Sequence, residues 1–296
     1  MPIQLHAGVP LLVLAVCLAM QSAHAQTLNG AIDIHAHCDP DGTPRSIDAI
    51  DLARLAKSRG MRAIVLKNHY EPTASLAYIV RKEVPGIEVF GGISLDLTNG
   101  GVNPAAVEWM TKVKGGYGRV VWMPTFDSEH NAAPEHRPFA RVAKDAKLVP
   151  EVIQVIGIIA KHNLVLETGH SSPAECLMLI REGKRQGVRN IVVTHAINKL
   201  VGMSIPEMQE AAKLGAYLEF VYVKPGSNDA QAHVEAIRAV GPEHCILSSD
   251  LGQAGNPLHP DGLLAFYQYL HQQGFSESEI DLMSKVNPAK VLGLEP

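Results

Sequence analysis

Two histidines separated by one residue, His35 and His37, lie in the apolar segment Ala31–Asp39, which reads AIDIHAHCD. The segment predicts a short strand, whose side chains alternate between two faces, so Asp33, His35 and His37 share one face. Two imidazoles placed in this way can bind one metal ion, and a carboxylate such as Asp33 can fix the tautomer of a ligand histidine. Two ordinary buried or surface histidines would give the same pattern. The opposite face carries the apolar side chains Ile32, Ile34 and Ala36.

Residues of the same chemical types follow later apolar runs. Glu167 and His170 end one run, His195 ends the next, and Asp250 follows the last. If the runs are strands of a parallel barrel, their ends form a ring at one mouth of the barrel. Imidazole and carboxylate groups suit Zn, Mn or Fe, and four of the 14 histidines lie at these positions. The predicted metal ligands are His35, His37, His170, His195 and Asp250.

Apolar runs and helical patterns alternate along the chain after residue 30. Continuous apolar runs predict strands that are buried on both faces, and apolar residues at helical spacing predict the helices between them. Capping patterns support two helices, through Ser172 with Glu175 and Ser204 with Glu207, and Ser46 is the expected N-cap of the first helix. The predicted helices include 46–59, 73–82 and 104–114. The predicted strands are 31–39, 61–69, 87–95, 119–123, 163–169, 190–194, 216–221 and 245–249.

This alternation predicts a (β/α)8 barrel of the TIM type as a single domain over residues 26–296. The length of 296 residues and the 46% content of hydrophobic residues are sufficient for a core of that size. An open doubly wound sheet is the alternative, because short apolar runs do not determine whether a sheet closes. One connection is long, from Pro124 to Val149, and in a barrel it would lie over the catalytic face.

The first 25 residues have the features of a secretory signal peptide. They contain no Asp, Glu, Lys or Arg, include the apolar run Val9–Met20, and end in Ala23-His24-Ala25, a small-x-small cleavage pattern. We expect a mature protein that begins at Gln26, is periplasmic or secreted, and keeps no stable membrane anchor. A retained anchor is the alternative, although the run is shorter than the ~20 residues of a spanning helix.

Composition limits the kinds of partner. The chain has 26 basic and 30 acidic residues and no basic tract, which argues against nucleic acid and leaves a small-molecule substrate. Cys38, Cys176 and Cys245 have no close pair and predict no disulfide framework. Cys38 is interpreted as a packing residue, with contact to a metal as the alternative. Whether the chain forms a homo-oligomer stays open.

The ligand pattern resembles the amidohydrolase superfamily of metal-dependent hydrolases. The resemblance rests on His35 and His37 after the first strand, His170 and His195 after the fifth and sixth, Asp250 after the eighth, and a closing helix near residues 287–294. It implies a barrel in which a metal-activated water attacks a small-molecule amide, ester or lactone. In this scheme Asp250 is the general base, and His195 binds a second ion or stabilises charge on the substrate.

The chain departs from the two-metal members of that superfamily. Those members usually carry a bridging Lys or Glu on the fourth strand, whereas the strand here ends Val121-Trp122-Met123. One ion is therefore favoured over two, with Zn placed before Mn or Fe, unless Lys67 or Glu167 supplies a bridge. Whether Lys67 is carboxylated stays open.

A weaker resemblance points to the polymerase-and-histidinol-phosphatase (PHP) family, through the segments 33–37 and Lys67-Asn68-His69. It implies phosphoester hydrolysis with His69 as an additional ligand. Glu88, the other acid that this resemblance offers, begins a predicted strand and lies at the wrong end of the barrel. Two further alternatives are a metal-dependent non-oxidative decarboxylase and a non-catalytic periplasmic protein that binds a metal or a solute.

Overall fold

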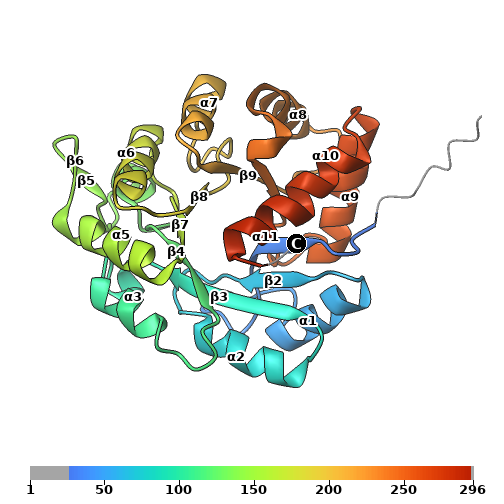
Figure 1. The fold of residues 1–296 in the computed structure, drawn as a ribbon, viewed down its shortest axis with the longest axis horizontal. Helices are drawn as coiled ribbons and strands as arrows, with labels where there is room; N and C mark the ends of the chain where they lie inside the picture. The colour runs from blue at the N-terminus through green and yellow to red at the C-terminus, as the bar shows by residue number, and fades with distance from the viewer. Residues whose placement is uncertain (1–26, 295–296) are drawn as a thin grey trace, which may run out of the picture.

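The computed structural model describes residues 27–294, so the predicted signal peptide lies outside the described residues. One sheet of eight parallel strands runs in the order β1-β2-β3-β4-β7-β8-β9-β10, and helices surround it (Figure 1). Each strand of the predicted set is present; seven are shorter than predicted by one to five residues, and the strand predicted at 119–123 is shifted by one residue. The strands are β1 (Ile32–Ala36), β2 (Ala63–Leu66), β3 (Glu88–Ser94), β4 (Gly118–Trp122), β7 (Val165–Glu167), β8 (Asn190–Val193), β9 (Tyr217–Val221) and β10 (Cys245–Ser248).

The first and last strands of the sheet meet. The N–H of His37 donates to the carbonyl of Leu251 at 2.9 Å, and the N–H of Asp250 donates to the carbonyl of His35 at 2.8 Å. These bonds lie at the carboxyl ends of β1 and β10 and bring the two segments into contact. The predicted (β/α)8 barrel is confirmed, and the open doubly wound sheet is wrong.

The helices begin largely where the capping patterns predict. Glu175 accepts a hydrogen bond from the N–H of Ser172 at 2.8 Å and completes the capping box of α6. The expected N-cap Ser46 is wrong: Asp48 caps α1, and the N–H of Ser46 donates to the carbonyl of Gly252. The helices are α1 (Ala49–Ser58), α2 (Ala74–Glu83), α3 (Pro104–Met110), α4 (Glu129–Ala132), α5 (Pro150–His162), α6 (Pro173–Arg185), α7 (Ile205–Lys213), α8 (Asn228–Val240), α9 (His259–Gln272), α10 (Glu277–Asp281) and α11 (Asn287–Leu292).

Apolar side chains form two layers, one between strands and helices and one inside the ring of strands. The inner layer contains Ile32, Ile34 and Trp122, together with Val291 and Leu292 of α11. The predicted closing helix is therefore present, and it packs against the inner layer of the barrel. None of the helices within residues 27–294 is long and apolar enough to cross a membrane.

The predicted alternation of β1 is wrong at one point. The pairing register of β1 with β2 shifts between Asp33 and Ala36. Because of this irregularity, Ile32 and Ile34 belong to the inner layer while Ala36 belongs to the outer one. The shift lets the strand bury two isoleucines inside the barrel and still direct His35 into the site above them.

The connection 124–149 contains structure of its own. It includes α4 and a small antiparallel pair, β5 (Ala143–Lys144) and β6 (Lys147–Leu148). The guanidinium of Arg141 lies 2.6 Å from Glu129, and that of Arg137 lies 3.6 Å from Asp127. These two cations of the connection are thus paired with its own carboxylates.

Candidate metal centre

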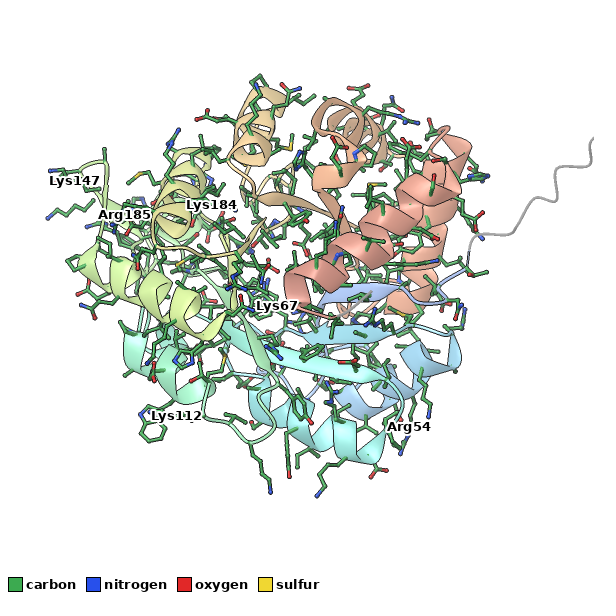
Figure 2. The ribbon with its side chains drawn as sticks, in the orientation of Figure 1. Arg54, Lys67, Lys112, Lys147, Lys184 and Arg185 are labelled. Atoms are coloured by element: carbon green, nitrogen blue, oxygen red, sulfur yellow. The ribbon has the colours of Figure 1, made fainter. Side chains whose placement is uncertain are left out.

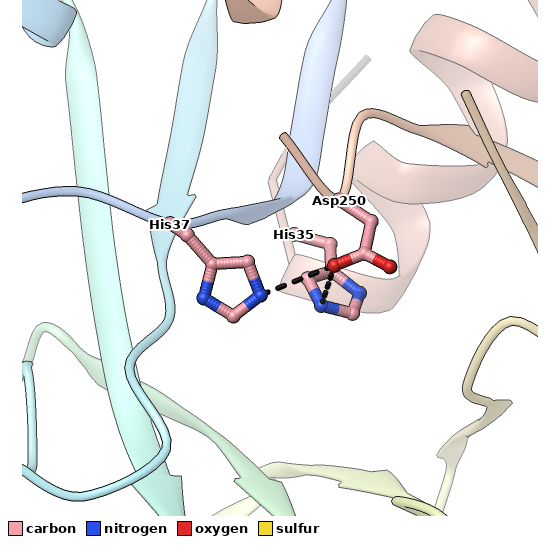
Figure 3. Close-up of side chains that lie close together, drawn as sticks. All are labelled: His35, His37 and Asp250. Atoms are coloured by element: carbon pink, nitrogen blue, oxygen red, sulfur yellow. Dashed lines mark hydrogen bonds and ion pairs between the residues drawn. The ribbon is translucent and has the colours of Figure 1, made fainter. Parts of the chain in front are cut away.

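Three donor atoms converge where β1 and β10 end (Figure 3). Nε2 of His35 lies 3.0 Å from Oδ1 of Asp250, and Nε2 of His37 lies 3.1 Å from the same oxygen. One donor atom from each residue lies within 4.8 Å of the other two, which is the spacing of ligands around one ion. The structure therefore brings together three of the five predicted ligands.

Backbone geometry positions these side chains. Asp250 has a φ of 50° and His195 a φ of 26°, in the left-handed region that side chains other than glycine rarely adopt. Such a residue costs on the order of 1–3 kcal/mol and is typical of functional sites. Gly252, at φ 125°, packs so closely that an added Cβ would clash with the carbonyl oxygen of His37. The segment after β10 thus packs against the backbone of a candidate ligand.

Glu219 of β9 orients His35, a role that the sequence did not predict. Its two carboxylate oxygens lie 3.1 and 3.2 Å from Nδ1 of His35, and it also accepts the N–H of His195 at 2.9 Å. Because a carboxylate only accepts, Nδ1 of His35 carries a proton and Nε2 faces the other donors. The only signal in the sequence was a lone acid inside the apolar strand YLEFV.

Asp33 does not have the role expected of it. Its Oδ1 accepts the N–H groups of His35 and Ser249, at 3.1 and 3.0 Å, and bonds to no imidazole. The register shift in β1 removes Asp33 from the face of the ligands. The carboxylate therefore joins β1 to the end of β10 and leaves the histidine tautomer to Glu219.

Charges in the centre are strongly coupled. Burial lowers the pKa of His37 to about 3, so this imidazole is neutral and can act as a ligand. Burial also opposes charge on His35, but Asp250 and Glu219 outweigh burial and raise its pKa to about 10. Burial would raise the pKa of Asp250, yet His35 and His37 hold it well below its usual range. A proton on His35 thus occupies the position that an ion would take.

His170 and His195 lie beside the three donors but outside their group. The Nε2 atoms of these two histidines are 3.2 Å apart, and the ring of His195 stacks 5.8 Å from that of His35. Burial lowers the pKa of His195 to about 4 and that of His170 well below its usual range. Both rings are therefore neutral and next to the site, where they can face an ion or a substrate.

Lys67 is inside the barrel, whereas other labelled cations such as Lys112 and Lys147 lie at the edge of the molecule (Figure 2). Its Nζ lies 2.9 Å from Nε2 of His35 and 5.5 Å from the ring centroid of Trp122 on β4. Burial lowers the pKa of Lys67. The fourth strand thus contributes the indole of Trp122 at this level.

Glu167 is also enclosed, between β4 and β8. Its Oε2 accepts the hydroxyl of Thr194 at 2.8 Å, and its Oε1 has no partner among the described residues. Burial, and then the charge of Glu219, raise the pKa of Glu167 to about 8. Glu167 is therefore protonated at neutral pH and takes no part in the group of three donors.

The three cysteines within residues 27–294 are packing residues. Cys38, Cys176 and Cys245 are buried and unpaired, and burial raises the pKa of Cys38 to about 12. A thiol with so high a pKa is a poor metal ligand. The interpretation of Cys38 as a packing residue fits its place in the outer apolar layer.

A cavity of about 660 Å³ begins at Asp250. The loops after β9 and β10 line it, with Tyr222 and Lys224 on one side and Gln253 and Asn256 on the other. The loops at the carboxyl ends of the strands thus form a space next to the three donors that is large enough for a small molecule.

The barrel, with imidazole and carboxylate donors at its carboxyl end, has the architecture of the amidohydrolase type. The chain belongs to the family of unknown function DUF6282, whose model matches residues 30–219. No curated protein matches the chain.

Solved structures share the fold at low sequence identity. An amidohydrolase from Pseudomonas aeruginosa has a TM-score of 0.62 and 13% identity, over 88% of this chain and 95% of that one. A 2,6-dihydroxybenzoate decarboxylase from Rhizobium has a TM-score of 0.58 and 12% identity, over 90% and 99%. A mutant PTE-like lactonase from Deinococcus radiodurans has a TM-score of 0.61 and 15% identity, over 91% and 97%. The likeness to amidohydrolases inferred from the sequence is thus confirmed for the fold.

Proposed function

We propose that this protein is an exported metal-dependent hydrolase that acts on a small-molecule amide, ester or lactone. The observation that carries the proposal is the convergence of His35 Nε2, His37 Nε2 and Asp250 Oδ1 beside a cavity. A protein that only binds a metal or a solute does not need a carboxylate that contacts both histidines and also lines the cavity.

The donors fit a divalent ion. Two imidazole nitrogens and one carboxylate oxygen suit Zn, and also Mn or Fe, and Glu219 fixes the ring of His35 from behind. We place Zn first and expect one ion, because His35, His37 and Asp250 are the group within residues 27–294 whose donors meet. One structural neighbour, a dihydroxybenzoic acid decarboxylase from Polaromonas, contains bound manganese.

A bound ion would act as a Lewis acid and lower the pKa of a bound water from about 15.7 to about 7. Oδ1 of Asp250 faces the two histidines, so Oδ2 of this ionised side chain, which is 21% exposed, is available as the proton acceptor. His195 is neutral and lies beside His35, where its ring can donate to developing charge on the substrate.

A metal-dependent decarboxylase is the second candidate. Two of the structural neighbours described above are dihydroxybenzoate decarboxylases that match over nearly their whole length. The two functions differ in the role of the site: a hydrolase needs a proton acceptor for water, whereas a decarboxylase releases CO2 from a substrate carboxylate. Release of CO2 from a carboxylate substrate by the purified protein would favour the second.

Elemental analysis of the mature protein, from Gln26 onward, tests the proposal. About one Zn, Mn or Fe per chain, lost in the double variant His35→Ala, His37→Ala, would support it. The variant Asp250→Asn should lower turnover at least about 100-fold on any amide, ester or lactone found by screening. No metal after growth in metal-supplemented medium, or turnover near the wild-type level in Asp250→Asn, would refute the scheme.

We also propose that the mature protein acts in the periplasm or outside the cell, on a small molecule. The support is the leader-like composition of residues 1–25. Amino-terminal sequencing of the protein from a periplasmic fraction should begin at Gln26, and a chain that retains Met1 would contradict export by cleavage.

A further inference from the structure

A chain of hydrogen bonds beside the donor group joins Asp96, Thr125 and His69. These residues follow β3, β4 and β2, respectively, at the carboxyl end of the barrel. Nδ1 of His69 lies 2.8 Å from Oγ1 of Thr125, and the hydroxyl of Thr125 makes a short hydrogen bond to Oδ2 of Asp96. All three residues are buried, with His69 the most exposed at 5%.

The direction of each hydrogen bond follows from the number of protons available. Oδ1 of Asp96 accepts the N–H groups of Thr125 at 2.8 Å and Asp127 at 3.0 Å, as an ionised carboxylate does. Burial raises the pKa of Asp96, and these hydrogen bonds oppose the rise. The single hydroxyl proton of Thr125 goes to Asp96, so its oxygen must accept a proton from His69.

His69 is therefore held as the tautomer with its proton on Nδ1. A neutral imidazole with its proton on Nδ1 carries a lone pair on Nε2. Nε2 has no partner among the described residues, yet it is not sealed inside the protein as Nδ1 of His37 and of His170 are. The lone pair is thus available to a molecule in the site.

The ring lies against the metal centre. It stacks on His37 with ring centroids 4.8 Å apart, and it packs against Phe126 at 4.4 Å and His170 at 6.1 Å. His69 nevertheless lies outside the three donors that meet. A neutral acceptor of fixed tautomer beside the donors, and not among them, is placed to contact the substrate.

We propose that His69 is a catalytic residue that accepts a hydrogen bond from the substrate at Nε2, and that Asp96 and Thr125 are positioning residues that fix its tautomer. The substrate class selected in this way carries an N–H or O–H group beside the reacting bond, as a primary or secondary amide or a hydroxy acid does. An analogue with that group methylated leaves the lone pair of His69 without a partner and is disfavoured.

The tautomer can be measured directly. In the mature protein labelled with 15N-histidine, a long-range 1H–15N correlation spectrum distinguishes a protonated Nδ1 from a protonated Nε2, and the spectrum of His69→Gln identifies the signals of His69. Wild type and Thr125→Ser should show Nδ1 protonated, because both have the hydroxyl. Thr125→Val, the isosteric variant without it, should show His69 partly or wholly protonated at Nε2.

A wild-type protein with His69 protonated at Nε2 would overturn the inference, however the variants fold. So would an unchanged spectrum in Thr125→Val. The metal content of His69→Gln separates the proposed role from that of a ligand: it should equal that of wild type, and loss of the ion would overturn the inference in favour of a metal ligand.

The catalytic part rests on the proposed function and uses a matched pair of substrates, a secondary amide and its N-methylated form. Wild type should prefer the N–H form by on the order of 100-fold in kcat/KM, and His69→Gln should lose most of that preference. Equal preference in wild type and His69→Gln would overturn it. If the proposed function itself is wrong, the result is different: wild type would lack both metal and turnover.

Discussion

Glu219→Gln is the sharpest test of how the metal centre is held. The substitution keeps the size of the side chain and an oxygen that can accept from Nδ1 of His35, but it removes a buried negative charge 3.1 Å from that ring. Glu167→Gln is the matched control. Glu167 is an equally buried acid on the neighbouring side of the barrel, and it contacts Thr194 and no histidine.

Two effects of Glu219→Gln oppose each other. Removal of the charge lowers the pKa of His35 from about 10, so the proton that competes with an ion for Nε2 is bound less tightly. It also removes attraction for the ion itself. Coulomb energy scales with charge, so the carboxylate stabilises a divalent ion about twice as strongly as a proton at the same distance. The second effect wins, and affinity falls.

The expected loss is about 10- to 100-fold in the dissociation constant of the ion, the range seen when a carboxylate behind a ligand histidine is removed. Glu167 has a pKa of about 8 and is already neutral at pH 7, so glutamine replaces a neutral acid there and little should change. Competition with a fluorescent chelator at pH 7 measures both constants. Wild-type affinity in Glu219→Gln, or an equal loss in Glu167→Gln, would refute this reasoning.

Two further predictions concern the support of His37. Burial lowers the pKa of His259, which donates to the carbonyl of His37, from 6.5 to about 4. Because this pKa is lowered, the contribution of His259 to the free energy of unfolding is full above pH 6.5 and is lost as the pH falls toward 4. Over this interval the free energy of unfolding measured with urea should fall by about 3 kcal/mol more for wild type than for His259→Gln. Parallel curves for the two proteins would contradict this. Gly252→Ala should weaken metal binding or unfold the protein, because its Cβ would clash with His37. Gly255→Ala is the control, since Gly255 also has a positive φ but open space around it, and it should lower the free energy of unfolding by only about 1–3 kcal/mol. Equal effects of the two variants in chelator competition and in urea unfolding would contradict the clash.

The sequence was sufficient for the architecture because the barrel has a strong local signature. Continuous apolar runs such as β10 and capping residues such as Ser172 mark the elements without knowledge of their partners. The candidate ligands His35, His37 and Asp250 could be predicted for the same reason, since each lies at or just beyond the end of such a run. His170 and His195 were also placed at the correct mouth, although their donor atoms do not join the group of three.

The orienting residues could not be predicted, because they depend on which segments meet once the barrel closes. Glu219 is 184 residues from His35 along the chain, and within its strand it reads as one acid among apolar neighbours. Thr125 and Asp96 lie in connections, and no periodicity marks the position of a loop residue. The register shift in β1 is also invisible locally, and it is the shift that transfers the orienting role from Asp33 to Glu219.

Closure of the barrel also decides whether the side chain of Lys67 is exposed or buried. A lysine after an apolar strand usually reads as a surface residue, yet the parity of β2 places this one inside the barrel, between His35 and Trp122. The pKa of Lys67 is lowered because the effect of burial outweighs the charges of the acids around it, of which Asp250 contributes most. The lowered pKa means that the ammonium proton is held less tightly than on a lysine in water, which eases the placement of Nζ beside a divalent ion. The same enclosure that makes the lysine unusual therefore makes it compatible with the metal centre.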